Sequence, residues 1–306
     1  IPDPVPATEP AKADPVPATE PAKADPVPAL NKLRIPHPPK DTKLVISPNK
    51  WNKIVGGLLM GKNVMLIGPK GCGKSLCARV VAEALGGEFY EFNAAQSVKP
   101  NRFFVGGMMA DPTKGTYFVP SRFYKAYTSN SDKPVVIFLD EITRTPAAAV
   151  NDMMNILSKG QGYIYNTETG EIAYKGKNVM MIAAGNIGMQ YTDTRSMDGA
   201  FWDRFQKVEL QYLEPNKEAA FLYGLYPSVK KESIFKLVQV AQMIRTAYNN
   251  NGLSAELSTR QLEDLVEFLH NGYDMSDIVE LLVNNFVNSG YDERDKVKAM
   301  LQGKGI

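Results

Sequence analysis

The residues with the clearest chemistry form one segment, Gly68-Pro-Lys-Gly-Cys-Gly-Lys74-Ser75. It fits the pattern G-x-x-x-x-G-K-[ST], which average residue usage gives by chance in roughly one per cent of chains of this length. Glycines let the backbone curl so that successive N–H groups face a phosphate, and a following helix adds the positive end of its dipole. Lys74 should then reach the β- and γ-phosphates, while the Ser75 hydroxyl binds Mg²⁺. The segment predicts a nucleotide phosphate site.

An ordinary glycine-rich turn is the alternative for this segment, and its neighbours in the sequence argue against it. An apolar strand is predicted immediately before it, over Asn63–Ile67, and a helix after it, over Ser75–Leu85. A phosphate loop needs both, because the strand fixes the loop and the helix supplies the dipole. The residues expected to contact the nucleotide here are Gly68, Pro69, Gly71, Cys72, Gly73, Lys74, Ser75 and Leu76.

Two acidic residues, Asp140 and Glu141, follow the buried apolar run Val135–Leu139. An Asp at the end of a second buried strand would complete the Mg²⁺ site with Ser75. Glu141 would orient and deprotonate an attacking water, which indicates a hydrolase rather than a small-molecule kinase. The alternative is that the two acids merely begin a helix, since acids favour that end. The phosphate loop favours hydrolysis.

The elements that must position these residues alternate in type. Continuous apolar runs separated by helical segments are typical of a parallel sheet covered on both faces. The chain therefore predicts an α/β domain over residues 41–214, followed by a small all-α domain over 215–306. The expected strands are Asn63–Ile67, Glu88–Phe92, Val135–Leu139, Val179–Ala184 and Gln206–Leu210. After Pro215, three- and four-residue apolar spacing predicts helices over Ile234–Tyr248, Arg260–Asn271 and Met275–Asn288.

Residues 1–40 differ from the rest of the chain. They hold 12 of the 21 prolines, and the segment Asp3–Ala13 (DPVPATEPAKA) recurs over Asp14–Ala24 and restarts at Asp25. So many prolines exclude a helix or a central strand, and there is little to bury. We expect a disordered linker or tether here, and about 266 residues in the folded part.

Composition excludes several classes of protein. Outside the tail there are 30 basic and 28 acidic residues, so there is no overall basic excess for nucleic acid or anionic lipid. No apolar run reaches 18 residues, so no membrane span is predicted, and the first residues lack the layout of a signal peptide. Cys72 and Cys77 lie within one loop and helix, which argues against a disulfide between them and favours a reducing, cytoplasmic location.

With these motifs the chain resembles the AAA+ ATPases, and within them the MoxR-like and dynein-related group that includes CbbQ and the cobaltochelatase subunit CobS. The resemblance spans about Lys43 to Gly290 and implies a P-loop NTPase fold with a five-stranded parallel sheet and a helical lid. It is carried by DEITRTPAAAVNDMMNIL (Asp140–Leu157), AAGN ending at Asn186, AFWDRF (Ala200–Phe205) and LSTRQL (Leu257–Leu262).

The resemblance implies roles for three further residues. Asn186 would be the sensor 1 residue that polarises the lytic water with Glu141. Arg204 would be an arginine finger that projects into the neighbouring subunit's site. Arg260 would be a sensor 2 residue that lies at the start of a lid helix and binds the γ-phosphate. Their structural alternatives are a strand cap, a surface ion pair and a solvated helix terminus, respectively. Arg195 and Arg144 are weaker candidates, Arg195 for a second residue acting in trans and Arg144 for a residue at the subunit boundary; a solvated or ion-paired surface role is the alternative for both.

The resemblance also gives meaning to two inserts. Asn101–Pro120 takes the place of an insert within a helix, and Gln161–Lys177 that of a hairpin before sensor 1; both would face a central channel. The alternative makes them decorations of a sheet edge. Residues there that could touch a substrate are Met108, Met109, Lys114 and Tyr117.

As a whole, the resemblance implies a hexameric ring of identical chains that hydrolyses ATP with Mg²⁺ and remodels or activates a protein partner. A protein with a von Willebrand factor A domain would be one such partner. The alternatives are a nucleic-acid motor or loader, a slowly hydrolysing binding module and a P-loop kinase. The near-neutral body and the lack of a helix-turn-helix argue against nucleic acid. ATP and GTP both remain open as the nucleotide.

Overall fold

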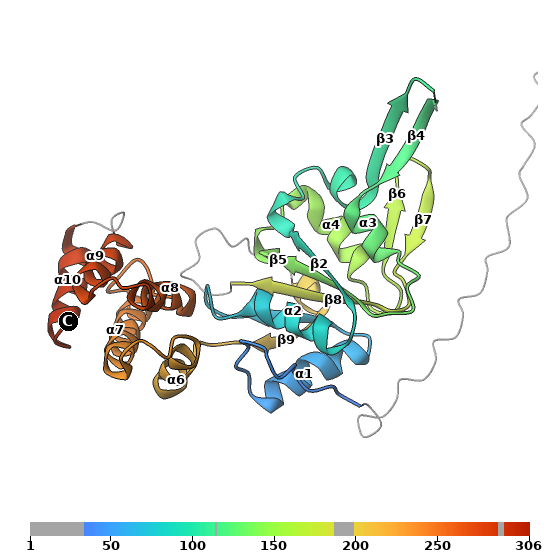
Figure 1. Ribbon diagram of the computed structural model, residues 1–306. Coiled ribbons are helices and arrows are strands. Elements are labelled where there is room, and N and C mark those ends of the chain that lie inside the picture. The colour runs from blue at the N-terminus through green and yellow to red at the C-terminus, as the bar shows by residue number, and fades with distance from the viewer. Residues whose placement is uncertain (1–33, 114, 187–198, 287–290) are drawn as a thin grey trace, which may run out of the picture.

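The computed structural model describes residues 34–113, 115–186, 199–286 and 291–306. Figure 1 shows two parts, an α/β lobe around a sheet and a lobe built only of helices. Two candidates from the sequence, Lys114 and Arg195, lie outside the described residues.

The α/β lobe is organised around one parallel sheet. Its strands run in the order β2-β5-β8-β1-β9, and every pair of neighbours is parallel. Because parallel strands share a direction, all their carboxyl ends lie at one edge. This confirms the predicted sheet, with boundaries shifted by a residue or so at four strands. The strands are β1 (Asn63–Ile67), β2 (Glu88–Asn93), β5 (Val135–Asp140), β8 (Val179–Gly185) and β9 (Phe205–Glu209).

Helices cover both faces of the sheet, and strand alternation explains how. Along β5, Val136 and Phe138 point to one apolar cluster, whereas Ile137 and Leu139 point to another. A strand buried on both faces must be apolar throughout, as this one is. Helices α1 (Pro48–Leu59) and α2 (Lys74–Ala84) contribute to the first cluster. Helices α3 (Arg122–Tyr127) and α4 (Ala147–Ile156) contribute to the second.

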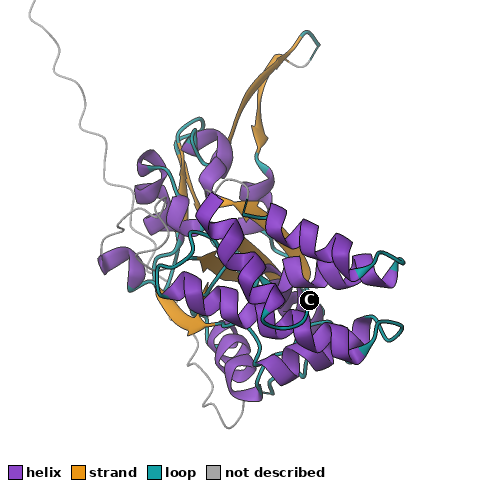
Figure 2. Ribbon diagram, turned by 90° about the vertical axis from the view of Figure 1, so that its left-hand side faces the viewer, coloured by secondary structure: helices purple, strands orange, loops and turns teal. Residues whose placement is uncertain are grey.

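Both inserts form antiparallel hairpins, as predicted for Gln161–Lys177. The first pairs β3 (Gly106–Asp111) with β4 (Gly115–Pro120) and follows a π-helical turn, η3 (Asn101–Val105). It projects from the α/β lobe in Figures 1 and 2. The second pairs β6 (Tyr163–Asn166) with β7 (Glu171–Tyr174).

Glycine is required where the first hairpin begins. Gly106 has φ +132°, and a Cβ there would lie 2.2 Å from the carbonyl oxygen of Val119. Any side chain would therefore push the two strands apart. The turn of the second hairpin touches the base of the first, where Asn101 Nδ2 donates a hydrogen bond to Glu168 Oε1 over 2.9 Å.

The helical lobe packs around its own apolar cluster, whose members include Leu237, Ile244 and Leu262. Side-chain capping begins α8, where Ser258 and Gln261 form a capping box. None of the described helices is long and apolar enough to cross a membrane. The helices are α6 (Pro215–Leu225), α7 (Lys231–Asn249), α8 (Thr259–His270), α9 (Met275–Asn284) and α10 (Tyr291–Gln302), so α9 ends before the predicted Asn288. A short helix, α5 (Gly199–Trp202), precedes β9 in the other lobe.

A buried ion pair crosses the helical lobe. Arg245 Nη1 and Nη2 donate to the two carboxylate oxygens of Glu218 over 2.8 and 2.9 Å. The side chains of Arg245 and Glu218 are 5% and 0% exposed. Removing one partner of such a pair leaves an uncompensated charge in a low-dielectric interior.

We therefore expect Arg245→Ala to lower the free energy of unfolding of this lobe by about 3–5 kcal/mol. Lys236→Ala is the matched control, because Lys236 lies on the same helix in an exposed ion pair with Glu232 and should cost under about 1 kcal/mol. Urea denaturation followed by circular dichroism measures both. Equal losses in the two variants would contradict the expectation.

Candidate nucleotide site

The phosphate loop joins β1 to α2 at the carboxyl edge of the sheet. Gly71 and Gly73 have φ of +70° and +92°, the left-handed region that favours glycine. At Gly68, a Cβ would lie 2.1 Å from the carbonyl oxygen of Leu210. All three glycines are thus required by the backbone, and the loop has the shape that the motif predicts.

Lys74 begins α2 and turns back into the loop. Its Nζ donates to the carbonyl oxygens of Gly68 and Pro69 over 2.8 and 2.7 Å, and to Asn186 Oδ1 over 2.8 Å. Burial lowers the pKa of the Lys74 ammonium from its usual value. The structure therefore brings together Lys74 and Asn186, which follow adjacent strands β1 and β8.

Ser75 and Asp140 face each other beside the loop. The Ser75 hydroxyl donates to Asp140 Oδ2 over 3.4 Å, and Asp140 Oδ1 accepts from the Glu141 N–H over 2.9 Å. Hydroxyl and carboxylate oxygens are the donors that a hard cation such as Mg²⁺ prefers. The two side chains fit the metal site that the sequence predicts, with the remaining ligands left to phosphate and water.

Glu141 follows β5 with a strained backbone. Its φ of +52° is left-handed, which is uncommon outside glycine and is found at functional sites. Glu141 Oε2 accepts a hydrogen bond from Asn93 Nδ2 over 3.1 Å, and Oε1 lies 3.4 Å from Arg144 Nη1. The carboxylate is therefore held between two side chains at the same edge as the phosphate loop.

Asn93 is a site residue that the sequence analysis missed. It ends β2 and lies opposite Asp140 in the parallel register, so its side chain emerges next to Glu141. Its position in the sequence could have identified it, because a polar side chain at the carboxyl end of a strand next to β5 must lie at this edge of the sheet.

Arg204 is not part of this site. It precedes β9, whose first residue Phe205 pairs with Asn63 at the start of β1, whereas the phosphate loop leaves the other end of β1. Five residues of strand separate the two ends by ~17 Å. Arg204 Nε donates to the Met154 carbonyl over 2.9 Å, and Nη1 donates to the Ala200 carbonyl. Its guanidinium thus lies at the opposite edge of the sheet.

Arg260 is the second residue of α8, at the point where the helical lobe meets the loop. A Cβ on Gly71 would lie 2.7 Å from Ser258 Cβ and 3.6 Å from Arg260 Cβ. A further link joins the lobes, because Lys43 Nζ lies 3.2 Å from Glu263 Oε1. The Cβ of Arg260 therefore lies beside Gly71 of the loop, and its predicted contact with the γ-phosphate stays a prediction.

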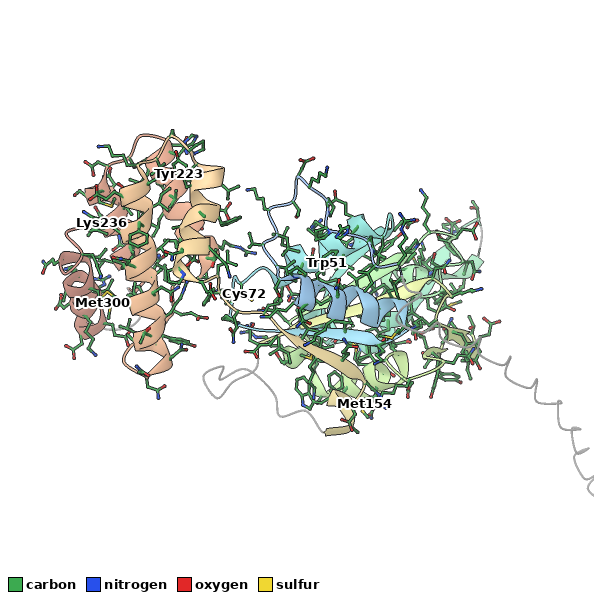
Figure 3. The ribbon with its side chains drawn as sticks, turned by 90° about the horizontal axis from the view of Figure 1, so that it is seen from below. Trp51, Cys72, Met154, Tyr223, Lys236 and Met300 are labelled. Atoms are coloured by element: carbon green, nitrogen blue, oxygen red, sulfur yellow. The ribbon has the colours of Figure 1, made fainter. Side chains whose placement is uncertain are left out.

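Cys72 and Leu76 have packing partners. In Figure 3, Cys72 lies where the α/β lobe faces the helical lobe. Its Sγ is 4.0 Å from the Leu210 carbonyl oxygen, and burial raises the pKa of the thiol from its usual value. Leu76 packs in part against the apolar cluster beneath α2. The nucleotide contacts predicted for both residues would therefore be made mainly by their backbone.

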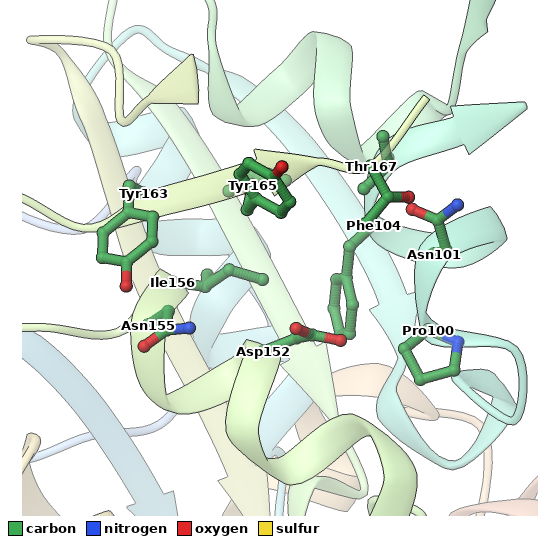
Figure 4. Close-up of a pocket in the computed structure, with 11 residues that line it drawn as sticks. Pro100, Asn101, Phe104, Asp152, Asn155, Ile156, Tyr163, Tyr165 and Thr167 are labelled. Carbon is green, nitrogen blue, oxygen red and sulfur yellow. The ribbon is translucent and has the colours of Figure 1, made fainter. Parts of the chain in front are cut away.

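A hollow lies apart from the nucleotide site, between η3, α4 and β6. Figure 4 shows Phe104 from η3, Asp152 from α4 and Tyr165 from β6 around it. Its volume is about 90 Å³. Burial raises the pKa of the Asp152 carboxyl from its usual value.

Residues 63–205 match a family model described as "AAA domain (dynein-related subfamily)". Similar proteins include the Lon protease of Leptospira interrogans, 29% identical over 180 residues that make up 55% of this chain and 19% of that protein. An uncharacterized AAA family ATPase of Sinorhizobium fredii is 29% identical over 190 residues, 60% of this chain and 47% of the relative. The chain thus spans about a fifth to a half of the length of these relatives.

Among solved structures, NtrX from Brucella abortus in complex with ADP has a TM-score of 0.47 and 19% identity, over 76% of this chain and 52% of that one. The family match covers the strands that hold the phosphate loop, Asp140, Glu141 and Asn186. Residues 63–205, slightly less than half of the chain, therefore form a domain that matches the AAA family, dynein-related subfamily.

Proposed function

We propose that this chain is a Mg²⁺-dependent ATPase that acts as a ring motor of the MoxR-like type on a protein partner. One observation carries the proposal: the site gathers Lys74, Glu141 and Asn186 at one edge of the sheet, while Arg204 lies at the opposite edge. A second copy whose Arg204 edge packs against this site would complete it.

Within one subunit, each group has a defined task. The loop amides and Lys74 hold the phosphates of ATP, and phosphate oxygens take over the hydrogen bonds that Lys74 makes to the Gly68 and Pro69 carbonyls. Ser75 and Asp140 would hold Mg²⁺, which would supply positive charge to stabilise the phosphate groups. Glu141 accepts the proton of the attacking water, and Asn186 orients that water from the end of β8.

Ring formation follows from the position of Arg204. A site that needs an arginine from the next copy is heterologous, and a heterologous interface closes into a ring when the rotation between copies permits. We propose six copies, with each Arg204 directed at the γ-phosphate of its neighbour. Arg260 binds the same phosphate from within the subunit and so links the helical lobe to the nucleotide state.

The two hairpins support a protein as the client. Both hairpins expose apolar and aromatic side chains to solvent. Groups of exposed apolar side chains are typical of protein interaction sites. Such side chains can bind a polypeptide without requiring a particular sequence. Our candidate for the client is a protein with a von Willebrand factor A domain. The exposed hairpin residues are Met108, Met109, Tyr117, Tyr165, Ile172 and Tyr174.

A nucleic-acid motor is the second candidate function, and the formal net charge of +2 does not favour it. The test is steady-state phosphate release over a range of protein concentrations. Hydrolysis should require ATP and Mg²⁺, stop with EDTA, and rise per chain as copies assemble. Salt-sensitive stimulation by DNA would instead support the nucleic-acid motor. Activity per chain that is constant at every concentration would contradict the shared site.

A further inference from the structure

Tyr212 connects the two lobes to the phosphate loop. It lies in the link from β9 to α6, visible in Figure 1 between the two parts of the molecule. Its hydroxyl donates a hydrogen bond to the carbonyl oxygen of Lys70, inside the loop, over 2.7 Å. No motif in the sequence marks this residue, because the two partners are 142 residues apart.

The ring of Tyr212 also supports the buried ion pair of the helical lobe. The guanidinium carbon of Arg245 lies 4.0 Å from the ring centroid, a cation–π contact. The same planar group binds Glu218 through both Nη atoms and donates from Nε to the Leu257 carbonyl over 2.7 Å. The face of the guanidinium contacts Tyr212, and its N–H groups bind Glu218 and the Leu257 carbonyl. Three partners therefore fix its position.

The chain of contacts then returns to the loop. Glu218 Oε1 accepts a further hydrogen bond from the Thr259 hydroxyl over 2.6 Å. Thr259 begins α8, between Ser258, which packs against Gly71, and Arg260. The contacts from Tyr212 through Arg245 and Glu218 to Thr259 therefore lead from Lys70 of the loop to the start of α8, where the neighbouring Ser258 packs against Gly71.

We propose that Tyr212 is a positioning residue for the phosphate loop, and that this closed set of contacts makes the loop and the start of α8 move as one unit. Tyr212 acts through the Lys70 carbonyl and does not touch the nucleotide. A buried ion pair adds little stability compared with apolar residues of the same volume, but it fixes the geometry of its partners. In this chain the pair between Arg245 and Glu218 would fix the start of α8 relative to Tyr212. The consequence for hydrolysis rests on the proposed ATPase function.

Tyr212→Phe tests this, because it keeps the ring under Arg245 and removes only the hydroxyl. Tyr223→Phe is the matched control: Tyr223 lies in α6 and its ring also contacts a cation, with Lys231 Nζ 4.5 Å from the ring centroid. Amide hydrogen exchange is measured on both full chains without nucleotide. In Tyr212→Phe the amides of Gly68 and of residues 70–74 should exchange about fivefold faster, the factor for one net hydrogen bond. Tyr223→Phe should match the unmodified chain there.

A second variant, Thr259→Val, cuts the same set of contacts at its other end and should raise exchange in the same loop amides. With nucleotide, the dissociation constant for ATP should rise by a similar factor in Tyr212→Phe, while kcat stays within twofold. The proposal is overturned if loop exchange in Tyr212→Phe equals that in Tyr223→Phe, or if exchange rises uniformly in both lobes, which is a purely structural effect. Because exchange is measured without nucleotide, this result stands even if the chain hydrolyses no ATP.

Discussion

Glu141→Gln is expected to lower kcat for ATP hydrolysis by about 10²–10⁴ while ATP binding persists, because the amide cannot accept the proton of the attacking water. Glutamine has the size of glutamate and leaves the backbone at φ +52° unchanged. In the variant, the amide oxygen can still accept the hydrogen bond that Asn93 Nδ2 donates to the Glu141 carboxylate in the unmodified chain. Ser75 and Asp140, the predicted metal ligands, are untouched. The substitution therefore removes proton transfer and leaves the groups that bind ATP in place.

Phosphate release in a single turnover and equilibrium binding of a fluorescent ATP analogue measure the two effects. Glu91→Gln is the matched control, since Glu91 is a carboxylate on β2 paired with Arg79 over 3.0 Å, outside the site. It should leave both quantities unchanged. Rapid phosphate release by Glu141→Gln would remove Glu141 from the mechanism. With ATP retained, the same variant should stall on its client, so affinity capture with it can identify the partner.

The sheet and the phosphate loop were predictable because each rests on a local pattern. An apolar run such as Val135–Leu139 is buried on both faces of any sheet that contains it, and glycines with φ above zero leave few other residues possible. The expected elements do not include α1, although Trp51 and Ile54 have helical spacing. Its Gly56-Gly57 pair disfavours a helix locally, and only the tertiary structure explains it: a Cβ on Gly57 would lie 2.8 Å from Gln206 Oε1.

The rest of the site depends on contacts between distant segments. Asn93 reaches Glu141 only because β2 and β5 are neighbours in the sheet, an order that no single strand encodes. The hydrogen bond from Tyr212 to Lys70 depends on how the link between the lobes passes the loop. Such pairs follow from packing of the whole chain, so sequence patterns predict the nucleotide-binding motif but not the residues that hold it in place.

Arg204→Ala is expected to lower kcat by about 10³–10⁵, the contribution of an arginine finger, with nucleotide affinity nearly unchanged. Affinity persists because Arg204 lies at the edge of the sheet opposite its own phosphate loop. Arg79→Ala is the matched control, because Arg79 is an exposed arginine on α2 that pairs with Glu91. Steady-state hydrolysis and ATP binding are measured for both. An equal loss in Arg79→Ala would mean that any lost surface arginine impairs the assembly.

Mixing variants decides whether Arg204 acts in trans. Lys74→Ala subunits cannot hold the phosphates but still carry Arg204, whereas Arg204→Ala subunits have an intact loop and lack the finger. In a random equal mixture, about a quarter of the interfaces pair an intact loop with a neighbour's Arg204. Each variant alone should be inactive, and the mixture should recover up to about a quarter of the unmodified activity. If Arg204 served its own subunit, no interface in the mixture would contain a complete site, and activity would stay at the level of the separate variants.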